Sequence, residues 1–170
     1  EELYRRDPDN RLLARGPRFR LTGELVRDQA LAASGLLVPK IGGPSTRPYM
    51  PVGVWSETNR YGNLRNYKAD TGEGLYRRSM YTIWKRTAAP PSMLLFDAPN
   101  RETCTPKRSR TNTPLQALAL MNEVTYVEAA RALGQRMMKE GGDSVESRLK
   151  TGFRLVTART PDSETLEVLK

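Results

Sequence analysis

The residues best suited to chemistry in this sequence are basic and aromatic side chains that recur in the middle of the chain. Arg77, Tyr81 and Lys85 follow one another at intervals of four residues, and Arg78 stands beside them. On a helix over 75–86 they would share one face. Their cationic groups could hold an anion while the tyrosine ring stacks on a sugar or a base. The alternative is a solvated basic face with internal ion pairs, which add little stability.

A second basic set precedes a predicted helix start. Thr-Pro-Leu-Gln at 113–116 has the order of an N-cap, a first-turn proline and a capping-box glutamine. Free backbone N–H groups at such a start can bind an anion, and arginine beside them strengthens the site. Simple capping is the alternative. We therefore add three residues to the anion-binding candidates: Arg108, Arg110 and Asn112.

Catalytic and metal-binding patterns are sparse. Asp97 and Glu102 are the one pair we consider for carboxylate-based hydrolysis, although their neighbours equally indicate an Asx turn and an arginine partner. Cys104 is the single cysteine, so it forms no internal disulfide, and we expect it to be structural. The sequence contains no histidine, which excludes histidine-based zinc, haem and triad sites from this chain. We expect no metal and no catalytic residue that can be named.

The net charge of +9 favours anionic partners. Nucleic acid is a minor alternative, because it requires the arginines to form one continuous face. A solvated basic surface accounts for the charge equally well. No apolar run approaches the length needed to span a membrane, so we expect no membrane span.

Hydrophobic periodicity predicts an all-α fold, an irregular domain of about six to seven helices. Helix signals occur at 10–15, 23–34, 75–86, 114–121, 123–139, from 145 and from 161. We expect one helical core that includes Ala30, Ala33, Met80, Ile83, Trp84, Leu118, Leu133, Leu149 and Phe153.

Between the second and third of these helices lies a long segment, 38–74, that is rich in proline and glycine. Its aromatic residues indicate an ordered loop rather than a disordered linker, because linkers lack large apolar side chains. These residues are Tyr49, Trp55, Tyr61 and Tyr67.

Several sequence blocks resemble a known family. They are DPDNRLLAR, ALAASGLLVPKIGGPS, PVGVW, VEAARALGQRM, GFRLVTARTPDSETL and the long central block LYRRSMYTIWKRTAAPPSMLLFDAPNRETCTPKRSRTNTPLQALALMN. Together they resemble the C-terminal domain of unknown function 1553 of planctomycete exported proteins that carry cytochrome-c-type modules. One departure is Glu123-Val124, where relatives tend to have a proline near the helix start.

The resemblance implies a mostly helical module downstream of other domains, in an extracytoplasmic protein linked to polysaccharide breakdown. It offers no catalytic residues to carry over, and the haem motif of the companion domain is absent from this chain. We therefore expect no cofactor in this segment.

Residues 1–170 are expected to form a single helical domain, a fragment of a longer multidomain protein. The function that we expect is a non-catalytic interaction or scaffold module contacting acidic or sulfated polysaccharide, or an acidic companion domain of the same chain. A carboxylate-based hydrolase acting on polysaccharide is the alternative. Enzymatic activity is therefore left open, although we favour the absence of activity for this segment alone.

Overall fold

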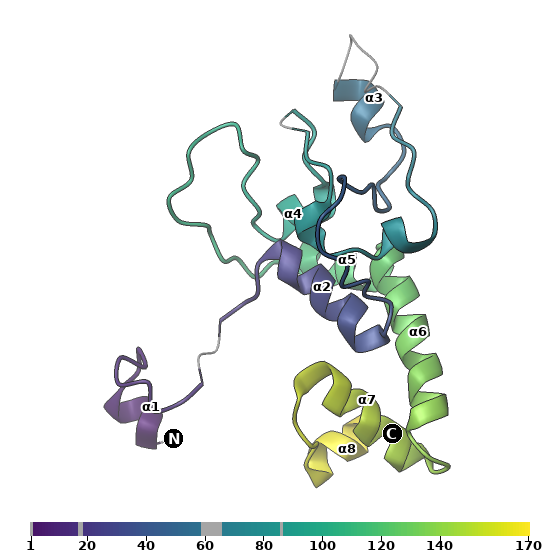
Figure 1. The fold of residues 1–170 in the computed structure, drawn as a ribbon. Coiled ribbons are helices and arrows are strands. Elements are labelled where there is room, and N and C mark those ends of the chain that lie inside the picture. Colours follow the sequence, from purple (N-terminus) through teal and green to yellow (C-terminus); the bar gives the residue numbers. More distant parts are fainter. Residues whose placement is uncertain (1, 17–18, 59–65, 86) are drawn as a thin grey trace.

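The computed structural model describes residues 2–16, 19–58, 66–85 and 87–170, and the part it describes is helical without a sheet. The all-α prediction is confirmed (Figure 1). The described chain contains eight α-helices and two short 3-10 helices: α1 (Glu2–Arg6), α2 (Gly23–Ser34), α3 (Val54–Thr58), η1 (Gly72–Leu75), η2 (Ser79–Tyr81), α4 (Pro91–Leu95), α5 (Pro114–Asn122), α6 (Val124–Glu140), α7 (Val145–Thr157) and α8 (Ser163–Leu169).

Helix α2 lies at the centre and contacts α4, α6, α7 and η2. It begins after Thr22 and ends at Gly35, whose positive φ of 78° reverses the chain, as the sequence predicts. Leu31 is completely buried, and the small side chains of Ala33 and Ala129 are buried too. Small residues let two helices approach closely, which explains why α2 and α6 make the most extensive helix contact in the described chain.

The C-terminal helices begin at capping side chains. Glu123 accepts hydrogen bonds from the first backbone N–H groups of α6, and Ser144 accepts one from Ser147 at the start of α7. Asp162 caps α8 in the same way, so this helix begins two residues later than Pro161, where the sequence predicts its start. The Asp162 carboxylate explains the shift, because it accepts a hydrogen bond from the otherwise unpaired backbone N–H of Thr165 at 2.8 Å.

The predicted helix over 75–86 is wrong in its described part, 75–85, and Arg86 lies outside the described residues. In its place the structure has η1, η2 and extended backbone. This backbone bonds to a distant segment instead of to itself: Val38 N–H donates to Tyr76, and Thr46 N–H donates to the carbonyl of Tyr81. Those long-range bonds use carbonyls that an α-helix would need for its own ladder. The four-residue spacing of the basic side chains therefore creates no common face.

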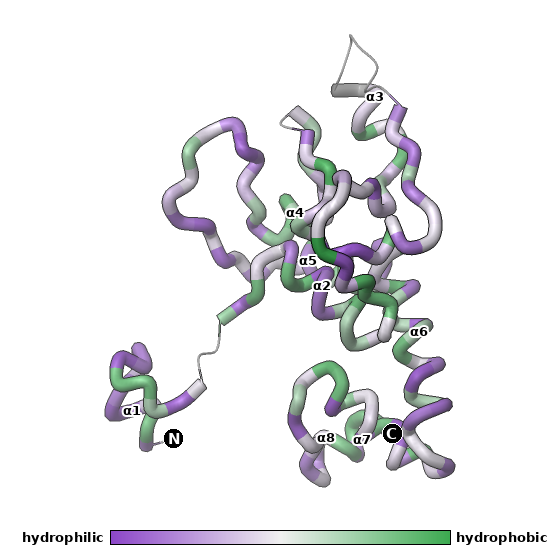
Figure 2. Tube along the Cα trace, viewed as in Figure 1, coloured by the Kyte–Doolittle hydropathy of each residue, from purple (hydrophilic) through white to green (hydrophobic). Residues whose placement is uncertain are grey.

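The predicted core is correct only in part. Ala33 is buried, but Met80 and Leu118 are exposed at 64% and 56% of their surface. The remaining predicted core residues are half-buried, Trp84 among them: Ala30, Ile83, Trp84, Leu133, Leu149 and Phe153. Short helices (α3 and η1) and irregular segments supply much of the real core instead: Trp55, Leu75, Ala88, Ala89, Phe96 and Ala98. The coloured tube shows apolar stretches along these segments (Figure 2).

Two further local predictions can be compared with the structure. The helix predicted over 10–15 is replaced by turns, in which the Asp7 carboxylate accepts from the N–H groups of Arg11 and Leu12. The loop prediction for 38–74 holds in its described part, which contains only α3 and part of η1. Trp55 and Tyr67 pack edge to face with ring centroids 5.0 Å apart, whereas Tyr61 lies outside the described residues.

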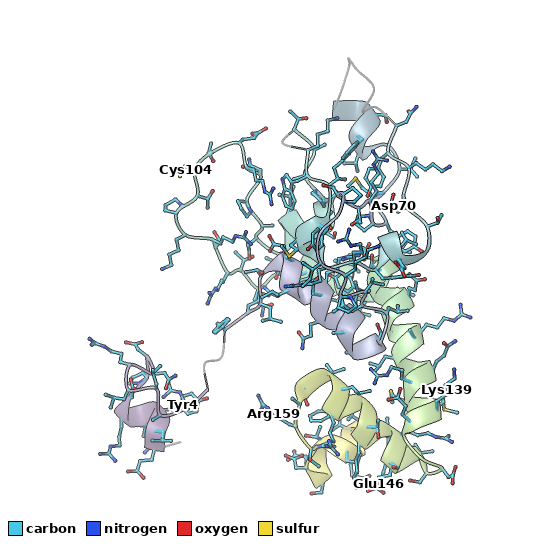
Figure 3. The ribbon with its side chains drawn as sticks, in the orientation of Figure 1. Tyr4, Asp70, Cys104, Lys139, Glu146 and Arg159 are labelled. Atoms are coloured by element: carbon cyan, nitrogen blue, oxygen red, sulfur yellow. The ribbon has the colours of Figure 1, made fainter. Side chains whose placement is uncertain are left out.

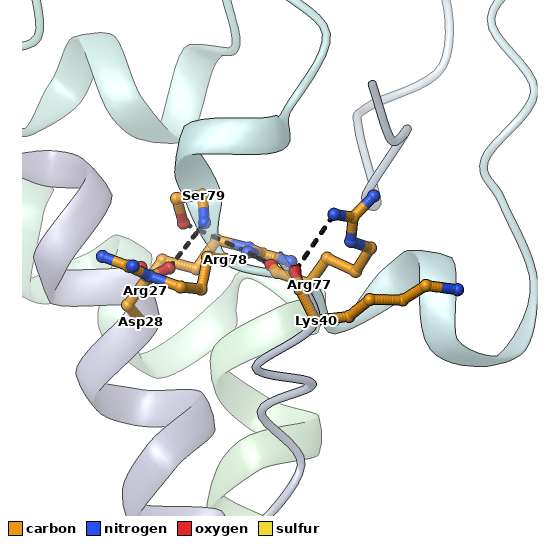
Figure 4. A network of polar contacts seen from close by, with 6 residues as sticks. All are labelled: Arg27, Asp28, Lys40, Arg77, Arg78 and Ser79. Atoms are coloured by element: carbon orange, nitrogen blue, oxygen red, sulfur yellow. Dashed lines mark hydrogen bonds and ion pairs between the residues drawn. The ribbon is translucent and has the colours of Figure 1, made fainter. Parts of the chain in front are cut away.

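A buried polar cluster joins α2 to the irregular segments (Figure 4). Arg27, only 5% exposed, donates to the carbonyls of Leu75 and Arg77 and to the hydroxyl of Ser79. Asp28 accepts from the backbone N–H of Ser79 at 2.7 Å. Burial lowers the pKa of the Arg27 guanidinium, and the neighbouring Asp28 charge opposes that shift. The cluster therefore connects α2 to a loop about fifty residues later in the chain.

Two glycines of the α6 region should respond oppositely to substitution. A Cβ at Gly134 meets no atom within 4 Å, whereas one at Gly141 would lie 2.7 Å from the Cα of Arg148. We expect Gly134→Ala to raise the free energy of unfolding by about 0.5–1 kcal/mol, because alanine loses less entropy in a helix. Gly141→Ala should lower it by about 1–3 kcal/mol through overpacking. Urea unfolding measures both changes, and a stabilised Gly141→Ala protein would contradict this packing.

Candidate functional site

Arg77 and Tyr81, two of the predicted anion-binding residues, are occupied within the protein. Arg77 is 6% exposed, and its guanidinium donates to the carbonyls of Lys40 at 3.1 Å, Pro44 at 3.0 Å and Gly42. It also lies 4.0 Å from the centroid of the Tyr81 ring, and the Tyr81 hydroxyl accepts from the N–H of Gly42. Because these contacts bind the chain to itself, Arg77 is a structural clamp rather than a ligand-binding residue.

The other two candidates of this stretch lie in different surroundings. Arg78 forms an ion pair with Asp28, 3.6 Å between the charged atoms, at the edge of the buried cluster. The Lys85 ammonium is buried and lies 5.1 Å from the centroid of the Trp55 ring. The structure therefore does not bring Arg77, Arg78, Tyr81 and Lys85 together in one anion-binding surface.

Arg108 and Arg110, by contrast, line one cleft of about 760 Å³. We call it the basic cleft. It lies between the residues leading into α2, the residues after α4, and the long exposed loop that precedes α5. Figure 3 shows this loop projecting from the body of the protein, with Cys104 at its outer part. The lining residues are Arg20, Leu21, Thr22, Phe96, Asp97, Lys107, Arg108, Ser109 and Arg110.

The wall of the basic cleft is organised by Gln116, which is only 1% exposed. Its Oε1 atom accepts from the backbone N–H of Thr113 at 3.0 Å, as expected for the glutamine of a capping box, and from the guanidinium of Arg20. Its Nε2 atom donates to the carbonyl of Leu95 at 2.8 Å and to the hydroxyl of Thr111 at 3.0 Å. Gln116 therefore fixes both the start of α5 and the position of Arg20.

Asn112, the last predicted candidate, joins the same network. Its Oδ1 atom accepts from the second Nη atom of Arg20 at 3.4 Å. Arg20 and Lys107 also line the cleft, although neither is among the anion-binding residues predicted from the sequence. Arg20 bonds to a residue 96 positions away, so no local spacing links the two. Lys107 does stand in the basic run before α5, and that run was the available signal.

The lining of the basic cleft is strongly positive, with four cations against the single carboxylate of Asp97. Arg108 pairs with Glu24 on α2, its Nη1 atom 2.8 and 3.0 Å from the two carboxylate oxygens. Arg110 lies over the Phe19 ring, 4.8 Å from its centroid. Within the described residues, Arg20, Lys107 and Arg110 form no ion pair. Three uncompensated cations thus face one cleft.

The arrangement offers little for catalysis. Asp97 has a positive φ of 62°, and its carboxylate accepts from the N–H and the hydroxyl of Thr111. Glu102 is exposed and does not line the cleft, so the two acids considered for hydrolysis are not found there together. No group of three or more potential metal ligands occurs among the described residues. None of the helices described is both long and apolar enough to cross a membrane.

The described residues form an all-helical fold with a positively charged cleft. The chain belongs to the PSD1 family, described as a protein of unknown function (DUF1553), and the match extends over residues 1–170. The family resemblance found in the sequence is therefore confirmed. No curated protein and no solved structure matches this chain.

The two neighbouring arginines at 77 and 78 should differ sharply in their effect on stability. Removing Arg77 leaves three carbonyls without their donor, and each buried unsatisfied group costs about 1–3 kcal/mol. We expect Arg77→Ala to lower the free energy of unfolding by about 3 kcal/mol or more. Arg78→Ala should cost below about 1 kcal/mol, because its ion pair is partly solvated. Equal urea midpoints for the two variants would contradict the structural role of Arg77.

The Glu24–Arg108 pair predicts a pH dependence. Burial works to raise the pKa of Glu24, but the hydrogen bond and charge of Arg108 outweigh it, so the pKa lies below its usual value. A lowered pKa stabilises the folded state above the unfolded pKa, and that contribution is lost as the pH falls through the folded pKa. We expect Glu24→Gln to be less stable than the parent at pH 7 by up to about 1 kcal/mol. The difference should vanish in unfolding experiments at strongly acidic pH.

Proposed function

We propose that this domain is a non-catalytic interaction module whose basic cleft binds acidic polysaccharide. The observation that carries the proposal is a cleft of about 760 Å³ lined by three cations that form no ion pair with any described residue. Arginine binds carboxylate and sulfate groups through paired hydrogen bonds, which gives both strength and direction. In line with the family resemblance, we place the module outside the cytoplasm, in a longer protein where companion domains supply any reaction.

Preorganisation of the cleft supports binding. Arg20 is held by Gln116 and Asn112, so part of its side-chain entropy is lost before any ligand arrives. The exposed loop that precedes α5 contributes one further exposed cation, Arg101. A long polyanion would contact the fixed wall and the loop together, and release of its counterions would add to the affinity.

Hydrolysis is the less well supported function for this cleft. Glycosidases need two carboxyl groups flanking the bond that is cleaved. Here Asp97 is the one acid among the described lining residues, and Thr111 already donates two hydrogen bonds to it. The site therefore favours binding of an acidic chain over its cleavage.

Heparin provides a probe for the sulfated class, and alginate one for the carboxylate class. We expect Lys107→Ala with Arg110→Ala to weaken heparin binding about tenfold or more at low salt and to reduce the slope of log affinity against log salt by about 2. Calorimetry over a salt series measures both. The control is Lys139→Ala with Arg159→Ala, which removes the same charge at exposed positions away from the cleft.

The comparison of the two double variants decides the proposal. An equal loss of heparin affinity in both double variants would mean that net charge alone, and not the basic cleft, attracts polyanions. Binding of uncharged dextran with similar affinity would also contradict it. Preference between heparin and alginate then identifies which acidic group the cleft selects.

A further inference from the structure

The loop between α4 and α5 is anchored to the body of the protein at its two ends. At the first end the indole N–H of Trp84 donates to the carbonyl of Asn100 at 3.4 Å. At the second end Thr111 donates to the carboxylate of Asp97. Between these anchors lies a stretch that we call the flap, residues 101–110, in which every residue is exposed and none belongs to a helix or strand. The flap projects from the body (Figure 3).

The middle of the flap has one hydrogen-bonded contact with the body in the described chain. Arg108 donates from Nη1 to both carboxylate oxygens of Glu24, at 2.8 and 3.0 Å. The other hydrogen bonds of residues 102–109 stay within the loop. Glu24 belongs to the first turn of α2, whereas Arg108 lines the basic cleft. This ion pair therefore holds the flap against the start of α2.

The ion pair leaves Arg108 accessible to a ligand. A guanidinium carries five N–H donors, and only those of Nη1 are used here: Nη2 and Nε donate to no described residue. The side chain of Arg108 is 38% exposed and that of Glu24 is 21% exposed. An acidic group from solvent can therefore reach the unused donors and then replace the Glu24 carboxylate, which has the same charge and the same kind of acceptor atoms.

We propose that Glu24 is an internal competitor of the polysaccharide: it occupies Arg108 and holds the flap closed until an acidic group of the ligand takes its place. This inference rests on the proposed function, because it concerns the regulation of the same cleft. The released flap would bring its four cations to the bound chain: Arg101, Lys107, Arg108 and Arg110.

Competition within the chain lowers the apparent affinity of the cleft. A ligand that needs Arg108 binds only the fraction of molecules in which Glu24 has let it go, so the apparent dissociation constant rises by the inverse of that fraction. A partly exposed ion pair is weak enough for a polyanion to displace, since Arg20, Lys107 and Arg110 attract the chain independently. Glu24 would thus reduce binding although it stabilises the fold.

Heparin titrations of charge-neutral variants test the competition. We expect Glu24→Gln to tighten heparin binding about fivefold at low salt in calorimetry, which is the factor that a partly exposed ion pair can contribute. The matched control is Glu102→Gln, which removes the same charge from an exposed residue of the flap that does not line the cleft. It should change the affinity by less than about twofold, because the charge of an exposed carboxylate is screened.

Arg108 supplies the second control. If Glu24 acts by occupying Arg108, its effect depends on that side chain. In an Arg108→Ala background, Glu24→Gln should therefore tighten heparin binding by less than about twofold, and a double-mutant cycle measures the difference.

Cys104 allows the flap to be observed without any ligand. It is exposed on the flap and is the single cysteine of the sequence, so a thiol-directed spin label reports on this site alone. We expect Glu24→Gln to make the label more mobile in electron paramagnetic resonance spectra, because the middle of the flap loses its ion pair. Glu102→Gln should leave the spectrum unchanged.

The two readouts separate this inference from the proposed function. Glu24 is not a competitor if Glu24→Gln binds heparin no more tightly than the parent, or if Glu102→Gln or the Arg108→Ala background gives the same gain. Equal label mobility in the parent and in Glu24→Gln would show that the ion pair does not hold the flap. Absence of heparin and alginate binding in every variant, with a mobile label in Glu24→Gln alone, would overturn polysaccharide as the ligand and uphold the role of Glu24 in holding the flap.

Discussion

The structure depends on buried guanidinium groups that bond backbone carbonyls where no helix or sheet does so. Arg27 and Arg77 together donate to five carbonyls of the segments around residues 40–44 and 75–77. Backbone acceptors removed from water need a donor, and an irregular segment has no ladder to provide one. Arg77 thus holds residues 40–44 of the proline- and glycine-rich segment, and Arg27 holds residues 75–79 against α2. The planar, forked guanidinium suits this role, because one side chain reaches several carbonyls at once.

This arrangement explains which features could be predicted from the sequence. The end of α2 and the starts of α5 and α7 follow from local capping chemistry, which involves residues three or four positions apart. Residues 75–86 have helical periodicity too, but long-range bonds from Val38 and Thr46 use their carbonyls instead. Helix propensity contributes only tenths of a kcal/mol per residue, so tertiary bonding prevails where the two conflict.

The residues of the candidate site likewise divide into those that local sequence predicts and those that only tertiary contacts position. Arg108, Arg110 and Asn112 are found from a basic run before a helix start, and the structure places them at or beside the basic cleft. Arg20 cannot be found in this way, because Gln116, which positions it, lies 96 residues later in the chain. Charge alone also cannot distinguish Arg77 from Arg110: one is buried among carbonyls and the other lines an open cleft. Local sequence gives the sign of the charge, whereas tertiary packing decides whether a ligand can reach it.

The buried contacts of Arg27 also constrain the order in which the chain can assemble during synthesis. Its partners Leu75 and Ser79 are made 48 and 52 residues later. At about 5–20 residues per second, the ribosome needs roughly 3–10 s to supply them. During that interval α2 can coil but cannot bury the side that carries Arg27, since a charged group without partners stays in water. The central helix is therefore translated before these partners, and it reaches its final packing only after residues 75–79 have emerged.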